Sequence, residues 1–291
     1  MKDIQKINNM ATDPIKNVLA GSVVQVIEEK QIKLFMSTII PKVTDVDGVD
    51  VTSKEILFNR EYFKGRAIVT DQRPETVPTV VMDSERVSVP MKWVSTGLRI
   101  TLDDKDKFAK GITKFENKAR AAMRTIAEEE ENFLKNGIVE LGTIGLQTIP
   151  GMKIVPTADL WKNLTGEEIL EELRISWNAH TVDGLFEALA LWLDKDLFDL
   201  LQKPYSATEP KTILNLLVER NWYGKIISIP RFGSGMIAED LPSNFGYHED
   251  LPLGMHVEYK EGTTDVYMLQ EHISSIMVFQ PSSLTRIEGA L

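Results

Sequence analysis

The side chains best suited to binding a metal are four histidines and the carboxylates beside them. The histidines are His180, His248, His256 and His272, and no two of them lie three or four residues apart. A metal site on a helix needs that spacing, because it places two ligands on one face. The only dense group is the run His248-Glu249-Asp250. Because Gly246 and Pro252 flank it, we interpret this run as a solvent-exposed loop rather than a metal site.

Two other groups could do acid, base or nucleophilic chemistry. Gly233-Ser234-Gly235 lacks the lysine of a phosphate-binding loop and the spacing of a serine nucleophile motif, so it predicts a turn. The run Glu128–Glu131 could supply a general acid only if a carboxyl group were buried. Four consecutive helical residues point in different directions, so we expect a solvated face or an ionic contact with a neighbouring subunit. The sequence therefore predicts no catalytic, cofactor-binding or metal-binding residue.

The composition excludes several other classes of function. Cysteine is absent, so there is no thiolate nucleophile, zinc site or disulfide, and the cytoplasm is the default compartment. The net charge of −10 argues against a protein that recognises nucleic acid by sequence. No apolar run approaches the length of a membrane span, and the N-terminal residues are too polar for a secretory signal. The five tryptophans are spread along the chain without a stacking pair, and we expect them to be core or interface anchors: Trp93, Trp161, Trp177, Trp192 and Trp222.

A long amphipathic helix is the strongest structural signal in the sequence. Apolar residues recur at steps of three and four between Lys114 and Gly137, which predicts one helix with a single apolar stripe. Gly137 is suited to end it in the left-handed conformation. The stripe consists of Phe115, Ala119, Ala122, Met123, Ile126, Phe133 and Leu134.

The segment before this helix has the sequence pattern of β-strands. A helix is predicted from Pro14 to about Phe35, and residues 39–102 then have the texture of β-structure. Strands are expected at 54–59 and 65–69, and a second pair at 77–82 and 85–91 with Asp83-Ser84 as the turn between them. The interspersed prolines favour a projecting ribbon over a central sheet, and such a ribbon needs a partner to lie on.

The sequence pattern after the long helix predicts an α/β unit. Thr165, Asp194 and Thr212 are suited to cap helices at 166–179, 195–202 and 213–220. The apolar runs 187–193 and 225–229 predict buried strands, and residues 257–279 return to β-structure.

This order of elements resembles the major capsid proteins of tailed viruses, which have the Hong Kong 97 phage-type fold, and the encapsulin shell proteins that share it. The resemblance covers about residues 15–290. Local patterns support it: 65–67 with 87–90 for the ribbon, 98–104 for the strand into the spine helix, 127–137 with 150–151 for the end of that helix, 225–230 for the axial strand and 265–281 for the terminal strand.

The resemblance implies an α+β fold with five parts. These are an N-terminal arm and helix (1–38), a β-ribbon or E-loop with flanking peripheral strands (39–102), a peripheral domain with a long spine helix (103–154), an α/β axial domain (155–256) and a returning peripheral strand (257–291). It also implies two kinds of contact between copies. In the E-loop the contact residues are Arg60, Tyr62, Phe63, Lys64 and Arg66. In the axial loop, near a symmetry axis, they are Pro204, Tyr205, Glu209 and Pro210. Within each subunit, the resemblance assigns to the spine helix the residues Phe115, Met123, Ile126 and Phe133.

The function that the resemblance implies is that of a structural major capsid protein, not an enzyme. Its copies would form pentamers and hexamers of an icosahedral shell around double-stranded DNA, in a virion assembled in the host cytoplasm. Further partners would be portal, scaffold or decoration proteins, with non-specific DNA contact and no membrane. The alternatives are an encapsulin shell around an enzyme cargo and, from another class, a two-domain α/β enzyme with its site near His248–His256.

Overall fold

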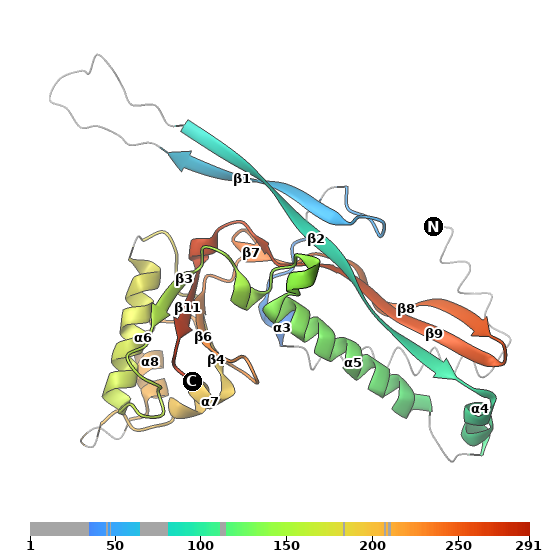
Figure 1. Cartoon of the computed structure of the whole chain (residues 1–291). Coiled ribbons are helices and arrows are strands. Elements are labelled where there is room, and N and C mark those ends of the chain that lie inside the picture. The colour runs from blue at the N-terminus through green and yellow to red at the C-terminus, as the bar shows by residue number, and fades with distance from the viewer. Residues whose placement is uncertain are drawn as a thin grey trace.

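Two β-sheets of different shape organise the chain, one long and narrow and one short (Figure 1). The computed structural model describes residues 35–291 except residues 45, 47, 65–80, 111–114, 183, 207, 209 and 210. The N-terminal arm, the predicted helix 14–35 up to residue 34, and the predicted strand 65–69 therefore lie outside the described residues. Within the described part, no helix is both long and apolar enough to cross a membrane.

The long sheet has the strand order β1-β2-β9-β8. Its strands are β1 (Glu55–Lys64), β2 (Val81–Ile100), β8 (Glu249–Glu261) and β9 (Thr264–Ser274). Residues 81–90 of β2 pair with β1, and residues 91–100 pair with β9. One strand thus joins a two-stranded ribbon to a three-stranded body.

The predicted turn at Asp83-Ser84 is wrong. Asp83 pairs with Tyr62 and Ser84 with Glu61, so both residues continue β2. Both are exposed, and polar residues are tolerated in a strand of which neither face is covered at that point.

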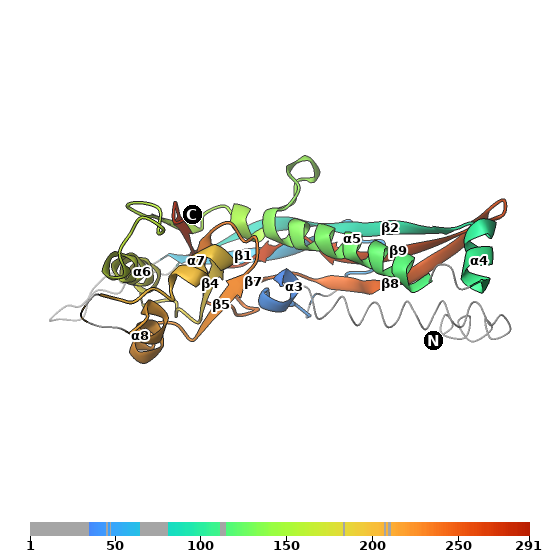
Figure 2. The same ribbon diagram turned by 90° about the horizontal axis from the view of Figure 1, so that it is seen from below.

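The predicted long helix is α5 (Phe115–Asn136), which lies along one face of the long sheet (Figure 2). It follows a short helix, α4 (Leu102–Ala109), at the far end of β2. Met123 and Ile126 of α5 are buried against Leu98, Ile100 and Leu269 of the sheet. Alternate residues of β2 and β9 supply the facing surface, as the two-residue period of a strand requires.

The short sheet has the order β3-β11-β6-β4-β5. Its strands are β3 (Lys153–Pro156), β4 (Ala190–Asp194), β5 (Lys225–Ile229), β6 (Gly235–Ala238) and β11 (Leu284–Glu288). Helices α6 (Gly166–Thr181), α7 (Lys195–Leu200) and α8 (Ile213–Arg220) pack with one face of it. The predicted caps Thr165, Asp194 and Thr212 each accept a hydrogen bond from the first turn of their helix.

The other face of the short sheet packs against the end of α5 and the short helix α3 (Met36–Ile39). Phe133, Trp192 and Phe245 belong to this shared core. Small elements complete it: η2 (Val139–Leu141), η3 (Leu146–Thr148), β7 (Phe245–Gly246), β10 (Met277–Val278) and η4 (Pro281–Ser283).

Two strands lie in a different sheet from the one that the expected boundaries imply. β8 begins at Glu249, inside the expected axial domain, but pairs with β9 in the long sheet. β11 lies within the expected peripheral segment 257–291, but pairs with β3 and β6 in the short sheet. Leu284 and Ile287 of β11 are fully buried there, so the C-terminal segment joins the two sheets.

Candidate functional site

The ribbon formed by β1 and residues 81–90 of β2 has two unlike faces. Ile56 and Val89 are buried, and the ring of Phe58 lies 4.8 Å from that of Phe279. On the opposite face, Leu57 is 47% exposed and Met82 is 57% exposed. Figure 1 shows the ribbon extending away from the rest of the long sheet. A ribbon with apolar residues on both faces, only one of which is covered, is suited to lie on another molecule.

The structure describes the predicted E-loop residues only in part. The Arg60 guanidinium donates to the Val278 carbonyl and lies 3.8 Å from the Glu85 carboxylate, so it fastens the ribbon to its own chain. Tyr62, Phe63 and Lys64 lie in β1, opposite Asp83, Met82 and Val81. Their side chains, and the whole of Arg66, lie outside the described part. Their role between copies stays a prediction.

The predicted axial loop follows α7, and backbone contacts fix its first residues. Pro204 pairs with Thr212 in an isolated bridge, and the Tyr205 N–H donates to the Lys211 carbonyl at 2.8 Å. A Cβ on Gly166 would lie 2.3 Å from the Pro204 oxygen, so only glycine lets the first turn of α6 approach so closely. Glu209 and Pro210 lie outside the described residues.

Lys203, at the start of this loop, contacts the segment that precedes α6. The Lys203 ammonium lies 3.4 to 3.5 Å from three backbone carbonyls, those of Trp161, Lys162 and Leu164. Tyr205 is half-buried against the core around α6 and α8. Hydrogen bonds and packing therefore fix the first residues of this loop.

The spine residues are buried as predicted where their side chains are described. Met123 and Ile126 face the long sheet, and Phe133 reaches the core shared with the short sheet. Phe115 begins α5, but its side chain is not described. The single stripe therefore joins two cores.

The interpretation of Glu128–Glu131 as a wholly solvated or intersubunit face is wrong for two of its four members. Glu128 and Glu129 are exposed, but Glu130 is buried and Glu131 is half-buried. The Glu131 carboxylate accepts the Phe35 N–H at 3.2 Å, and burial raises the pKa of this carboxyl above its ordinary value. α3 packs against α5 and its N-terminal end contacts Glu131, which the helical pattern of α5 alone could not reveal.

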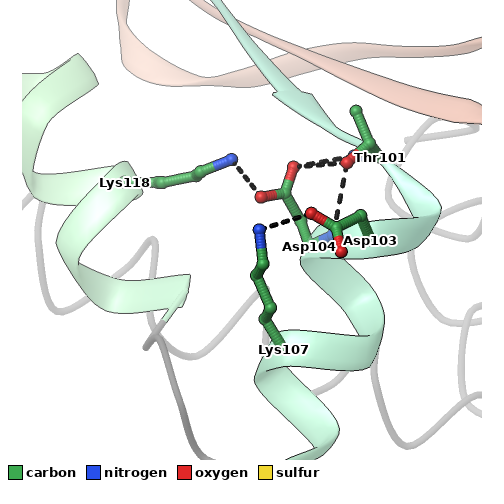
Figure 3. Close-up of polar contacts among 5 residues, drawn as sticks. All are labelled: Thr101, Asp103, Asp104, Lys107 and Lys118. Atoms are coloured by element: carbon green, nitrogen blue, oxygen red, sulfur yellow. Dashed lines mark hydrogen bonds and ion pairs between the residues drawn. The ribbon is translucent and has the colours of Figure 1, made fainter.

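A polar joint connects the end of β2 to both helices that follow it (Figure 3). The Asp104 carboxylate accepts the N–H of Thr101 at 3.0 Å and its hydroxyl at 2.8 Å, and it lies 2.7 Å from the Lys118 ammonium. Lys107 pairs with Asp103 one turn earlier. The Lys118 contact, followed by the bonds from Thr101, holds the pKa of Asp104 well below its ordinary value. The joint ties the end of β2, through Thr101, to α4 and α5.

This joint predicts a pH-dependent contribution to stability. Because the folded state lowers the pKa of Asp104, its contribution is present above about pH 4 and is lost as the pH falls towards the folded pKa. We expect Asp104→Asn to lower the free energy of unfolding at pH 7, and the difference from wild type to shrink below about pH 4. Urea melts at several pH values measure both.

The matched control is Asp103→Asn, because the Asp103 side chain is 72% exposed and its ion pair lies on the surface. We expect it to change stability little at any pH. An Asp104→Asn deficit that is equally large at pH 7 and at pH 3 would contradict the account of the joint.

The run His248-Glu249-Asp250 is not the solvent-exposed loop that we predicted. Glu249 begins β8 and pairs with Lys42, and Asp250 lies 3.3 Å from Nδ1 of the buried His272. The run is half-buried because β8 starts earlier than the strand pattern suggested. Among the residues that the structure describes, no group of three or more histidine and acidic side chains could hold a metal ion.

The turn predicted at Gly233-Ser234-Gly235 is confirmed only in part, because the chain bends at Ser234 but Gly235 already begins β6. Gly233 has a φ of +80° and its N–H donates to the Asp194 carboxylate at 2.7 Å, while the other oxygen of Asp194 caps α7. Ser234 is buried and lies 3.2 Å from the Gln147 amide. These contacts give the serine a structural role.

The tryptophans differ from expectation in one respect. Trp177 and Trp222 stack with ring centroids 6.0 Å apart, and the Arg220 guanidinium lies 5.0 Å from the Trp222 ring. This pair could not be predicted, because 45 positions of the sequence separate its members. Both rings also pack on the core of α6 and α8, so the pair fastens these helices together.

Comparison with known proteins identifies a family that the chain matches. Residues 65–235, more than half of the chain, match the family described as "Major capsid protein". No curated protein sequence matches the chain.

Solved structures share the fold at low sequence identity. The capsid of Myoviridae phage XM1 superposes with a TM-score of 0.69 at 10% identity, over 84% of this chain and 88% of that one. A virus-like particle from Pyrococcus furiosus gives a TM-score of 0.62 at 14% identity, over 92% and 98%. Gordonia phage Cozz gives 0.56 at 14% identity, over 87% and 85%. The architecture is thus that of Hong Kong 97 phage-type shells, as the sequence predicted.

Proposed function

Since the chain belongs to the major capsid protein family, we propose that its copies assemble into a closed icosahedral shell that encloses double-stranded DNA. The family match over residues 65–235 is the observation that carries this proposal. The role of the chain in such a shell is structural.

The ribbon is the part that we expect to join neighbouring copies. Its base is fixed to its own chain by Arg60, while Leu57 and Met82 leave an apolar surface on the other face. Burial of apolar surface contributes about 25 cal/mol per Å2, and a shell repeats each contact many times. Tyr62, Phe63, Lys64 and Arg66, which the resemblance assigns to the E-loop, would extend this contact.

The loop between α7 and α8 is the part that we expect to surround the five- and six-fold axes. Its rigid base around Pro204 and Tyr205 supports that role, because copies in a ring must present the same fixed surface. Tyr205, Glu209 and Pro210 of successive copies would then line the opening of each pentamer and hexamer.

The remaining partners follow from the proposed role. The net charge of −10 suits a container whose wall lets DNA move without adhering strongly. Portal, scaffold and decoration proteins would complete such a particle, which would assemble in the host cytoplasm. We propose no membrane contact.

An encapsulin shell around an enzyme cargo is the second candidate, because that class shares the fold. The ribbon argues for the viral function: β1 and residues 81–90 of β2 give it ten paired residues on each strand, which suits a large E-loop that locks rings of subunits together. The contents of particles from the native source decide between the two. Nuclease-protected DNA supports the capsid, and an enzyme cargo without DNA supports the encapsulin.

The mass of the purified chain in solution tests whether it forms a shell at all. We expect light scattering to show particles in the megadalton range, or capsomers that convert to such particles. The rival reading, a two-domain α/β enzyme with its site near His248–His256, predicts a small oligomer instead. A monodisperse monomer or dimer under every condition tried would refute the shell.

A further inference from the structure

The second half of β2 has one edge that no described strand covers. β1 pairs with the first half of β2 and β9 pairs with the second half, as Figure 1 shows. The Met91 N–H donates to the carbonyl of Lys54, the residue before β1, at 2.8 Å. The Pro90 carbonyl accepts the N–H of Ser275, the residue after β9, at 3.0 Å. These two groups of one trans peptide point in opposite directions, so β1 and β9 lie on opposite edges of β2.

The edge that β1 leaves is open from residue 92 to the end of β2 at Ile100. In a strand, the backbone N–H and C=O of one residue point to the same edge, and successive residues alternate. The residues whose backbone groups point away from β9 are therefore Trp93, Ser95, Gly97 and Arg99. A Cβ on Gly97 would meet nothing within 4 Å. An open edge of this length without proline is a template for another strand.

This edge is complementary to itself. The open stretch is centred on Thr96, and an antiparallel copy of β2 can place its own Thr96 opposite this one. Trp93 then lies opposite Arg99 of the other copy, and Ser95 opposite its Gly97. A shift of one residue would bring to the seam backbone groups that already bond to β9, and a shift of two would leave one residue of each copy unpaired. Only the centred register uses the whole edge.

The side chains at the two ends of the seam fit the same register. Trp93 is 45% exposed, and one face of its indole stacks on the His272 ring with centroids 4.5 Å apart. Arg99 is 66% exposed and lies 3.3 Å from the exposed Glu261, a surface ion pair that holds it weakly. The guanidinium of Arg99 can therefore cover the open indole face of the other copy, as a cation–π pair. The two-fold symmetry repeats this pair at both ends.

The other side chains of β2 at the seam are compatible with this pairing. On the face that α5 covers, Val94 lies opposite Leu98 of the other copy and Lys92 lies opposite its Ile100. The two copies of Arg99 are six residue levels apart, which is about 20 Å. No two like charges of β2 therefore face each other across the seam, and the cross-strand pairs are apolar or aromatic with basic.

We propose that two copies of the chain join their long sheets edge to edge through residues 93–99 of β2, antiparallel about a two-fold axis at Thr96. A second copy is the occupant because the centre of the open stretch, the backbone alternation and the Trp93–Arg99 pairs all require one symmetrical register. The contact is isologous, and an icosahedral shell has two-fold axes on which it can lie. This inference rests on the proposed shell and names one of its contacts.

Thr96→Cys tests the register directly, because the chain has no cysteine of its own. Residues opposite each other in a non-hydrogen-bonded antiparallel pair have Cα atoms about 4.5 Å apart, within the range of a disulfide. We expect oxidised particles of this variant to give a covalent dimer on a non-reducing gel. The matched control is Val94→Cys, on the same face of the same strand. Its two copies would be four residue levels apart, about 13 Å, and should give no dimer.

The outcomes separate the contact from the shell. Particles in which Thr96→Cys gives no dimer, or in which Val94→Cys links equally well, overturn the contact and leave the shell intact. A Thr96→Cys dimer without any particle supports the contact and contradicts the proposed function. Neither particles nor dimers would contradict both.

A proline at the open edge gives an independent readout. The Ser95 N–H points away from β9, so Ser95→Pro removes no ladder hydrogen bond within the subunit. We expect a folded chain, with unchanged near-ultraviolet circular dichroism, that needs at least about tenfold higher concentration to assemble, because two hydrogen bonds are lost at each two-fold contact. Ser95→Thr keeps the N–H and should assemble like wild type. A folded Ser95→Pro chain that assembles at the wild-type concentration would overturn the proposal.

Discussion

Replacing Phe133 with aspartate is expected to lower the free energy of unfolding by at least ~3 kcal/mol. Phe133 is 3% exposed and lies in the core that α5 shares with the short sheet. An aspartate there would place a charge among Trp192, Phe245 and Leu146. Because the two sheets meet in this core, we expect loss of the whole fold rather than local fraying. Urea unfolding followed by tryptophan fluorescence measures the change.

Glu129→Ala is the matched control on the same helix. Glu129 is exposed, and we expect its replacement to change stability by no more than about 0.5 kcal/mol. Equal destabilisation by both variants would mean that the assignment of buried and exposed faces of α5 is wrong.

Shortening the ribbon is expected to abolish shell formation while leaving the subunit folded. Arg60 and Glu85 lie opposite each other, so residues 61–84 can be replaced by Asn-Gly, which favours a tight hairpin turn. The residues retained include Ile56, Val89 and Met91, which hold the ribbon base in its core. Size-exclusion chromatography and near-ultraviolet circular dichroism test assembly and folding separately.

The outcome of that deletion separates two roles of the ribbon. A folded chain that no longer assembles supports a role between copies. Loss of the near-ultraviolet signal would show that the segment stabilises its own subunit. Full assembly of the shortened chain would show that the ribbon contributes nothing to the shell.

Local signals were enough to predict most helices of the chain. The capping residues Thr165, Asp194 and Thr212 act within one turn, so their effect is visible in the sequence. The stripe of α5 is likewise a local repeat, and the observed helix 115–136 differs little from the predicted 114–137. The order of such elements was also enough to indicate the family.

Contacts between distant segments could not be predicted in this way. Asp83-Ser84 has the composition of a turn, and only its pairing with β1 keeps it extended. Glu130 is buried because of what packs on α5 from elsewhere, and β11 crosses to the short sheet after a run of β-structure in the long one. The exposure of Val139 after α5 could not be predicted either, because nothing in the local sequence distinguishes it from a buried valine.

Electron cryomicroscopy of the purified chain tests the central claim most directly, since it shows both the shell and the place of each subunit in it. The account predicts closed isometric particles in which the α7–α8 loop surrounds the five- and six-fold axes and each ribbon lies across a neighbouring copy. Particles with this loop far from every symmetry axis would refute the axial assignment. Isolated subunits or small open oligomers under all assembly conditions would contradict the account itself.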